Sequence, residues 1–491
     1  MSKEFNTNTG QWALVVLRAT SNSARVWVGT LFPTLKMPDF ARVELVAPDD
    51  SVVVQRISKE DWRRPFRYIR QRFYTTVTFK NLEPGKHYKV HFLRRIETIK
   101  QVRNRSWQLL RSGQFDTLPT RLPAANRSPF TIGLGSCFYN HRDGGQAAGA
   151  YRALYERGNA SIKPTITFLT GDQVYLDIGF DSLSFVKREI RQRIAEDYAL
   201  HWQALGSILN RGATWMLPDD HEYWNDYPFY DSLIPALLAL KLDFVRETWN
   251  AAATDAVTRV QQSPRVETFN IGEDLSFCLA DLRSYRENNA FLPASDFEQL
   301  TDWASTLQCP GVLVVPQPLI VEHSKTERNL LSFKAQYQAL LQALGTSGHD
   351  IVLLSGDVHF GRIASASLGP QGGRLIEVIA SPLSNLTGLN GIATAVPQYK
   401  PKKFPDPAKI RIPGWLASKV KYDKSFAVST KRGWLFSSYP RARTREHFMT
   451  VGFKRTSNGQ VELLVNAWRV RERDAKNLPV RDFGEYRTNL I

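Results

Sequence analysis

Cysteine is scarce in this chain, since its 491 residues contain only Cys137, Cys278 and Cys309. Three scattered cysteines are too few for a disulfide framework and are more typical of a reducing compartment. The sequence has no run of about 18 apolar residues, and its first ten residues lack a basic stretch followed by an apolar one. It therefore shows neither a membrane-spanning helix nor an export signal, and these absences predict a cytoplasmic location.

Acidic residues are also in deficit. The chain has 47 Asp and Glu against 64 Lys and Arg, which gives a formal net charge of +17. This balance attracts anions such as phosphates, acidic polymers and lipid headgroups, but it does not determine the fold. The length is sufficient for more than one domain and a substantial core.

Residues 12–120 contain short stretches in which apolar and polar residues alternate, separated by turn-forming residues. Strands at this spacing predict a β-sandwich domain over residues 1–120. In the segment LEPGKHY, Pro84 and Gly85 form a turn and Tyr88 opens the next strand. This arrangement is typical of the tyrosine corner in immunoglobulin-like and fibronectin-like sandwiches. An ordinary Pro-Gly hairpin with a core tyrosine is the alternative interpretation.

The proline-rich, polar residues 121–129 predict a linker. From residue 130 to 491, apolar strands alternate with long helical patterns, which indicates an α/β or α+β catalytic domain. Within it, a basic insert from Lys400 to Arg445 has thirteen Lys or Arg against two acids. The insert could lie beside an anionic substrate, or contact an anionic polymer or a lipid surface. An ordinary solvated surface is the default interpretation.

Four apolar, strand-like stretches each end in side chains that can bind metal ions. In open α/β sheets, ligands collect beyond the carboxyl ends of the strands, so we expect these side chains to converge. The four groups are Ser136 and Cys137; Asp172 and Tyr175; Asp219, Asp220, His221, Glu222, Asn225 and Asp226; and Ser355, Asp357 and His359.

Taken singly, these segments read as a buried cysteine, a turn or an acidic helix start. Together they supply thiolate, phenolate, carboxylate, amide and imidazole groups, which predicts a metal site. Cys137 and Tyr175 must lose their protons to bind, which favours a highly charged ion such as ferric iron. The oxygen ligands Asp172, Asn225 and Asp357 suit calcium, magnesium or manganese. We therefore expect two unlike cations, with Asp172 bridging them.

Two adjacent cations suit the hydrolysis of phosphate esters, because they polarise the phosphoryl oxygens and activate a water as hydroxide. His221 is a candidate acid for the leaving group, and Asp220 or Glu222 could orient it. A buried, hydrogen-bonded structural histidine is an equally good interpretation of His221.

Arginine side chains are candidates for holding the phosphate. Arg283 and Arg286, in the segment DLRSYR, could clamp a phosphate with two hydrogen bonds. An ion pair between Asp281 and one of these arginines is the structural alternative. Arg142, just past Cys137, competes for the substrate role.

These residues resemble the PhoD family of alkaline phosphatases and phosphodiesterases, a branch of the calcineurin-like metallophosphatases. The motifs GSC, GDQVY, DDHEYWND, DLRSYR, SGDVHFG and IASPLSN stand in family order between Gly135 and about Asn385. The N-terminal strands also resemble the family's amino-terminal domain. The resemblance implies an α+β protein with a fibronectin- or immunoglobulin-like β-sandwich, followed by a metallophosphatase domain of two stacked mixed sheets flanked by helices.

The resemblance also implies a set of metal ligands. Ferric iron (Fe3+) would be held by Cys137, Asp172, Tyr175 and His359. Calcium (Ca2+) would be held by Asp172, Asn225 and Asp357, with Mn2+, Mg2+ or Zn2+ as substitutes. Family members are typically exported through a twin-arginine signal, which this sequence does not show, and the basic insert matches no family motif.

The predicted function is metal-dependent hydrolysis of phosphate monoesters or diesters. One alternative is a phospholipase-D-type phosphodiesterase acting on lipid headgroups, with the basic insert helping to dock it. An alternative of another class is a non-catalytic protein that holds nucleic acid or polyphosphate. The intact set of ligands argues against this last alternative.

Overall fold

The computed structural model describes residues 9–34, 37–96, 106–141, 143–231, 238–322, 328–369, 373–386, 421–422 and 446–491. Arg142 and nearly all of the basic insert lie outside the described residues. The fold is mixed α+β, as the sequence predicts, with both antiparallel and mixed sheets. Within the described ranges, no helix is long and apolar enough to cross a membrane.

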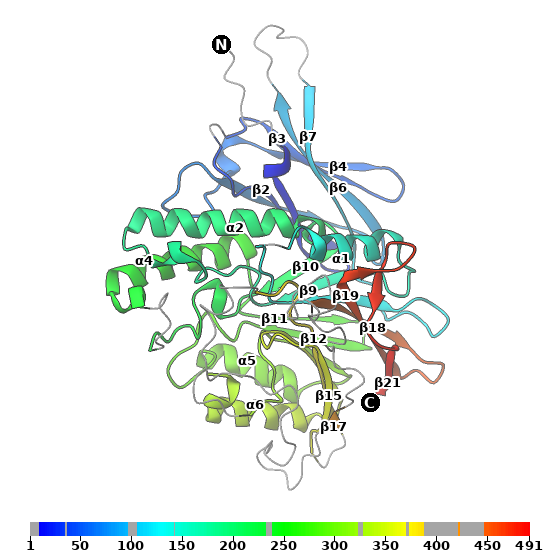
Figure 1. The fold of residues 1–491 in the computed structure, drawn as a ribbon. Helices are drawn as coiled ribbons and strands as arrows, with labels where there is room; N and C mark the ends of the chain where they lie inside the picture. Colours follow the sequence, from blue (N-terminus) through cyan, green and yellow to red (C-terminus); the bar gives the residue numbers. More distant parts are fainter. Residues whose placement is uncertain are drawn as a thin grey trace, which may run out of the picture.

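Two antiparallel sheets form the N-terminal part of the chain (Figure 1). The first has the strand order β1 (Ala13–Ala19), β2 (Ser23–Thr30), β5 (Phe73–Lys80), and the second the order β4 (Val52–Ile57), β3 (Ala41–Val46), β6 (His87–Ile96), β7 (Ser106–Asp116). Along β3 every second residue is buried, which explains the alternating sequence. The Tyr88 hydroxyl accepts a hydrogen bond of 2.9 Å from the Glu83 backbone N–H, the contact expected of a tyrosine corner.

Two seven-stranded mixed sheets make up most of the remaining chain. The first has the order β10 (Ala213–Leu217), β9 (Ile166–Thr170), β8 (Phe130–Gly135), β18 (His447–Arg455), β19 (Val461–Arg473), β20 (Pro479–Arg481), with β21 (Tyr486–Leu490) also paired to β19. The second has the order β11 (Val266–Ile271), β12 (Leu275–Ala280), β13 (Gly311–Val314), β14 (Ile351–Ser355), β16 (Arg374–Ile379), β15 (Arg362–Ser367), β17 (Lys421–Tyr422). Strands β8, β9 and β10 run parallel, as do β12, β13, β14 and β16.

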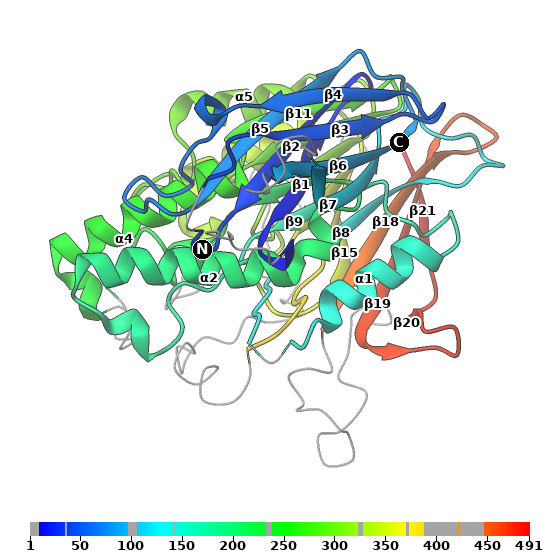
Figure 2. The same cartoon turned by 90° about the horizontal axis from the view of Figure 1, so that it is seen from above.

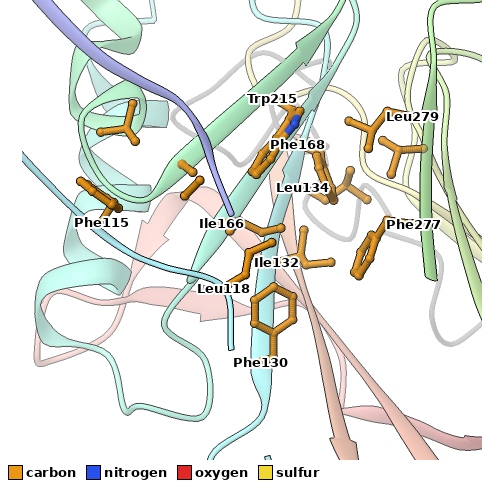
Figure 3. Close-up of a cluster of buried hydrophobic side chains, with 14 of the residues drawn as sticks. Phe115, Leu118, Phe130, Ile132, Leu134, Ile166, Phe168, Trp215, Phe277 and Leu279 are labelled. Atoms are coloured by element: carbon orange, nitrogen blue, oxygen red, sulfur yellow. The ribbon is translucent and has the colours of Figure 1, made fainter. Parts of the chain in front are cut away.

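The two seven-stranded sheets share one buried apolar core, part of which is shown in Figure 3. Across this core the Phe277 ring of β12 lies 6.5 Å from the Phe130 ring of β8 and 6.3 Å from the Phe168 ring of β9, centroid to centroid. Phe115, from β7, belongs to the same cluster. The N-terminal sheets therefore share core with the rest of the chain, and the predicted domain boundaries at residues 120 and 130 stay predictions.

Helices cover the outer faces of the two large sheets (Figures 1 and 2). On the first sheet lie α1 (Gln146–Arg157), α2 (Lys187–Leu209) and α4 (Asp243–Asp255), and on the second lie α5 (Ala294–Ser305) and α6 (Lys334–Thr346). The short 3-10 helices are η1 (Thr9–Gln11), η2 (Lys59–Asp61), η3 (Phe180–Leu183), η4 (Asp220–Glu222), η5 (Ala239–Lys241) and η7 (Leu330–Ser332), and η6 (Ala256–Gln261) is a π-helix. Because both faces are covered, β8, β9 and β14 are buried throughout, as their continuous apolar sequences require.

Candidate metal centre

The carboxyl ends of β8, β9 and β14 meet at one place between the two large sheets. Cys137 follows β8, and its Sγ lies 3.4 Å from Asp172 Oδ2, which follows β9. The same Sγ lies 3.4 Å from the backbone oxygen of Asp357, which follows β14. Residues that are 35 and 220 positions apart in the sequence thus contact one another, as the strand-end argument predicts.

Among the residues that the structure describes, potential ligand atoms form three overlapping groups, within each of which the atoms lie no more than 4.8 Å apart. Asp172 belongs to all three groups. A carboxylate has two oxygens and can bind an ion through each, so this position is suited to a bridging ligand. The groups are Cys137, Asp172 and His359; Asp172, Asp220 and His221; and Asp172, Asp219 and Asp357.

Tyr175 lies beside the first of these groups. Its hydroxyl is 3.1 Å from His359 Nε2, and the Nδ1 of His359 is 2.7 Å from Asn385 Oδ1. Because an amide oxygen only accepts hydrogen bonds, Nδ1 of His359 carries the proton and Nε2 is the nitrogen that faces Tyr175. A second hydrogen bond that fixes the tautomer in this way is usual for histidines that bind metals.

His221 is oriented by a residue that the sequence analysis did not identify. Its Nδ1 lies 2.7 Å from Asp177 Oδ1, and both side chains are buried. The other oxygen of Asp177 accepts a 2.8 Å hydrogen bond from the backbone N–H of Asn225. Asp220, one of the two partners expected for His221, instead accepts from the backbone N–H of Asp226 at 2.7 Å.

Glu222, the other expected partner, has a different role. Its two carboxylate oxygens accept from the backbone N–H groups of Asp172, Gln173 and Asp219, at 2.6 to 2.9 Å, and from the side-chain amide of Gln261 at 3.2 Å. Each of these four groups is a donor, so an ionised carboxylate satisfies them all. Glu222 therefore holds the loop after β9 against the loop after β10.

The arginines of DLRSYR are engaged with protein groups. Arg283 Nε lies 2.5 Å from Asp219 Oδ1, and both side chains are fully buried. The structural alternative, an ion pair of one of these arginines with Asp281, is not what Arg283 forms, since its partner is Asp219. A phosphate-clamping role for Arg283 stays a prediction. Arg286 donates to Gln317 at 2.8 Å, and Gln317 in turn donates to Asp357 Oδ2 at 3.1 Å.

The backbone at this site is unusual. Among the described residues, nine that are not glycine have a positive φ angle, and five of them lie here. Left-handed backbone is unfavourable for residues with a Cβ, and such conformations concentrate at functional sites. The five are Cys137, Asp172, Asp226, Asp357 and His359, with φ between 53° and 69°.

Burial and like charges make the ionised ligands unfavourable when no cation is present. Burial, followed by the proximity of Cys137, raises the pKa of Asp172 well above its usual value. Burial also raises the pKa of the Cys137 thiol to about 12 and, together with Asp220, the pKa of Asp357 to about 6. A bound cation would offset the burial and the like-charge repulsion and so stabilise the ionised ligands.

The side chains at this site could hold metal ions. A buried oxygen, Oδ2 of Asp219, has no hydrogen-bond partner among the described residues, which is an expensive arrangement unless an ion lies nearby. The thiol and phenol groups suit a ferric ion, and the carboxylates suit a hard divalent ion.

The structure is similar to that of PhoD. The similarity covers 98% of this chain and 88% of that chain, with a TM-score of 0.57 and 16% sequence identity, so it concerns the fold alone. Two small structures, a redesigned β-sandwich protein and the sensor domain of the anti-sigma factor RsgI4 from Pseudobacteroides cellulosolvens, each match 22% of this chain, with 17% and 18% identity. These matches cover 90% and 93% of the two smaller chains, but their TM-scores of 0.15 and 0.14 are too low to support a conclusion. No family model and no curated protein sequence matches.

The PhoD-like fold brings to the site three residues that sequence reasoning missed. Asp177 and Gln317 lie in loops whose sequences resemble no motif named above, so nothing local distinguishes them. Asn385 closes the segment IASPLSN, one of those on which the resemblance to PhoD rests, and its contact with His359 gives that segment a physical role.

Proposed function

We propose that this protein hydrolyses phosphate esters, as a phosphomonoesterase or phosphodiesterase that depends on bound metal ions. The observation that carries the proposal is the set of three ligand groups sharing Asp172, at the meeting point of two parallel-strand edges. Cations bound there would polarise the phosphoryl oxygens, lower the pKa of a bound water and stabilise the leaving oxygen.

Each end of the centre suits a different ion. Cys137, Asp172, Tyr175 and His359 would hold ferric iron. The carboxylates of Asp172 and Asp357, together with Asn225 from the loop after η4, would hold calcium or a substitute such as Mn2+, Mg2+ or Zn2+. The structural similarity to PhoD and the chemistry of the donors support this assignment, and the identity of the ions is part of the proposal.

His221 is the residue we assign to protonation of the leaving alcohol. Burial lowers the pKa of its imidazole, but the carboxylates of Asp177, Asp220 and Asp172 outweigh burial and hold the pKa well above its usual value. An imidazole that keeps its proton is suited to act as an acid. Asp177 fixes the ring by accepting from Nδ1, so that Nε2 is the atom left to deliver a proton.

The proposal extends to the architecture. The two N-terminal antiparallel sheets would correspond to an immunoglobulin- or fibronectin-like β-sandwich, supported by the Tyr88 contact. The pair of seven-stranded sheets with helices on both outer faces would correspond to a calcineurin-like metallophosphatase domain.

Hydrolysis of nitrophenyl phosphate and bis(nitrophenyl) phosphate by the metal-loaded protein tests the function. We expect activity that is lost on chelation, restored by metal, and abolished by Asp172→Ala. Element analysis should find iron and a second metal, and Tyr175→Phe should weaken a visible phenolate-to-iron absorption band. Activity that survives complete metal removal would refute the proposal, and tight binding of a polyanion without turnover would favour a non-catalytic role.

A further inference from the structure

Large exposed apolar side chains gather where α2 and α4 begin. Of the fourteen large hydrophobic residues that are exposed among the described ones, six form what we call the helix-end patch. Soluble proteins rarely collect such side chains in one place without a partner. The patch consists of Phe185 (55% exposed), Val186 (52%), Tyr230 (40%), Leu238 (49%), Leu242 (44%) and Phe244 (41%).

Contacts between the elements place the starts of α2 and α4 and the loop after η4 side by side. Helices α2 and α4 lie side by side in both views (Figures 1 and 2), and Arg193 of α2 lies over the ring of Trp249 in α4. At their first turns, Lys187 Nζ lies 6.0 Å from the centroid of the Phe244 ring. Arg246 stacks over Tyr230 at 4.2 Å, which joins the loop after η4 to the same surface.

Local stability does not explain this sequence. Phe185 and Val186 precede α2, and Val186 occupies the N-cap position without a side-chain cap. Lys187 and Arg188 then open the helix, although helix N-termini favour acidic residues and capping side chains. Helix α4 likewise begins after an uncapped apolar residue, Leu242. Each helix has one acidic residue in its first turn, Glu189 in α2 and Asp243 in α4, but neither N-cap residue has a capping side chain, and apolar and basic side chains are exposed beside them. The exposed apolar side chains at both helix starts therefore point to a binding role.

The charges around the patch identify the kind of partner. The segments that hold the patch, residues 185–191, 230–231 and 238–247, carry five basic side chains against four acidic ones, in a chain with a net charge of +17. A second copy of the chain would bring the same basic groups together, which is unfavourable. A polyanion without apolar groups, such as polyphosphate, would gain nothing from the apolar side chains. A membrane surface with anionic lipids satisfies both features, because rings enter the interface while lysine and arginine meet headgroups.

We propose that the helix-end patch docks this protein on anionic lipid membranes. The patch also lies near the candidate metal centre. Tyr230 lines a cavity of about 780 Å³ together with Arg286, and Arg286 is linked through Gln317 to Asp357. Arg193 of α2 donates to the backbone oxygen of Leu176, next to Tyr175. Docking would therefore place this side of the molecule towards the lipid. The binding itself does not depend on the proposed hydrolytic function.

Co-sedimentation of the full chain with vesicles tests the proposal. We expect binding to vesicles of phosphatidylcholine mixed with phosphatidylglycerol, weaker binding to phosphatidylcholine alone, and a decrease with added salt. The variant Phe185→Ser/Phe244→Ser should bind at least roughly tenfold more weakly, since two partly exposed rings are removed. Lys187→Gln/Lys241→Gln should lower the dependence on anionic lipid and on salt.

The chain offers a matched control on β4, where Val53 and Val54 are 49% and 43% exposed. Val53→Ser/Val54→Ser should bind vesicles as the unmodified protein does, and all variants should keep its circular dichroism spectrum and thermal unfolding. Equal loss in the control and the patch variant would overturn the proposal. So would self-association, measured by sedimentation velocity without lipid, that disappears with Phe185→Ser/Phe244→Ser. The proposal would also be overturned if the protein did not bind vesicles but bound polyphosphate equally well with and without the Phe185→Ser/Phe244→Ser substitutions.

Discussion

Replacing Asp172 by asparagine should change stability in opposite directions with and without metal. The carboxylate is buried, and Cys137, Asp219 and Asp220 lie close enough to oppose its charge, which raises its pKa well above the usual value. An asparagine side chain at this position has nearly the same shape. It keeps an oxygen that can accept from the His221 backbone N–H, which lies 3.3 Å from Asp172 Oδ1. The substitution therefore removes the charge with little loss of packing.

The sign of the metal-free effect follows from proton binding. In the unfolded chain Asp172 loses its proton at about pH 4, whereas in the folded protein it keeps the proton to a higher pH. In this window the folded state binds more protons, so the free energy of unfolding falls as the pH rises. Asp172→Asn removes this cost. The carboxylate keeps its hydrogen bonds but is buried beside like charges, and we expect the neutral side chain to be more stable by an amount on the scale of a buried polar-group penalty, about 1–3 kcal/mol at neutral pH.

The effect of metal has the opposite sign. A ligand at a thousand times its Kd stabilises the folded state by about 4.1 kcal/mol. With about 2.1 cal/mol/K of unfolding entropy per residue, 491 residues unfolding together have about 1 kcal/mol/K, so the Tm should rise by about 4 °C. If Asp172→Asn weakens binding a hundredfold, the same metal concentration gives only about 1.4 kcal/mol, and the Tm rises by about 1 °C.

Differential scanning calorimetry of both proteins, stripped of metal and then titrated with Mn2+ or Ca2+, measures all of these shifts. The metal-free variant should melt above the unmodified protein at neutral pH. The difference should shrink as the pH falls and reach its minimum below about pH 4, where the aspartate is protonated in both states. An equal metal-induced rise in Tm for the two proteins would show that Asp172 is not a shared ligand. A variant that melts lower in the absence of metal would show that the buried carboxylate is not under electrostatic stress.

Three further predictions concern the support of the site. Asp177→Asn should lower turnover roughly tenfold to a hundredfold. It should also move the alkaline limb of the pH profile of kcat/KM to lower pH, because the Asp177 carboxylate raises the pKa of His221. An unchanged pH profile in a variant with normal metal content would contradict this prediction. Glu222→Gln should lower the Tm by about 2–6 °C, since an amide nitrogen leaves two donors without an acceptor at about 1–3 kcal/mol each; thermal unfolding checks this. In Gly356→Ala the new Cβ would lie 2.3 Å from a side-chain oxygen across the site, so metal uptake should fall while Gly149→Ala, with nothing within 4 Å, keeps it.

Several parts of the site could be predicted from the sequence because their cause is local. A continuous apolar run followed by Gly171 and Asp172 determines a buried strand that delivers a carboxylate at its end, and β9 confirms this. The same reasoning located Cys137 and Asp357 at strand ends. Proximity of the three followed from one general property of parallel strands, whose carboxyl ends share an edge.

Other features depend on contacts between segments that are distant in the sequence. Asp177 contacts His221, and Glu222 accepts hydrogen bonds from two loops. Both contacts depend on how these loops are placed relative to one another, which no local sequence pattern encodes. Arg283 forms its ion pair with Asp219, 64 positions away in the sequence, and not with the nearby Asp281, for the same reason.

The sequence by itself determined which chemical groups this protein places at the ends of its strands, because strand and turn formation depend on neighbouring residues. Only the tertiary structure decided which of those groups meet. The facing of two sheets brings Cys137 to Asp357 across 220 positions, and the packing of α2 on α4 assembles the helix-end patch from segments that are distant in the sequence. Both outcomes rest on the burial of apolar faces, which is a property of the whole chain and not of any one segment.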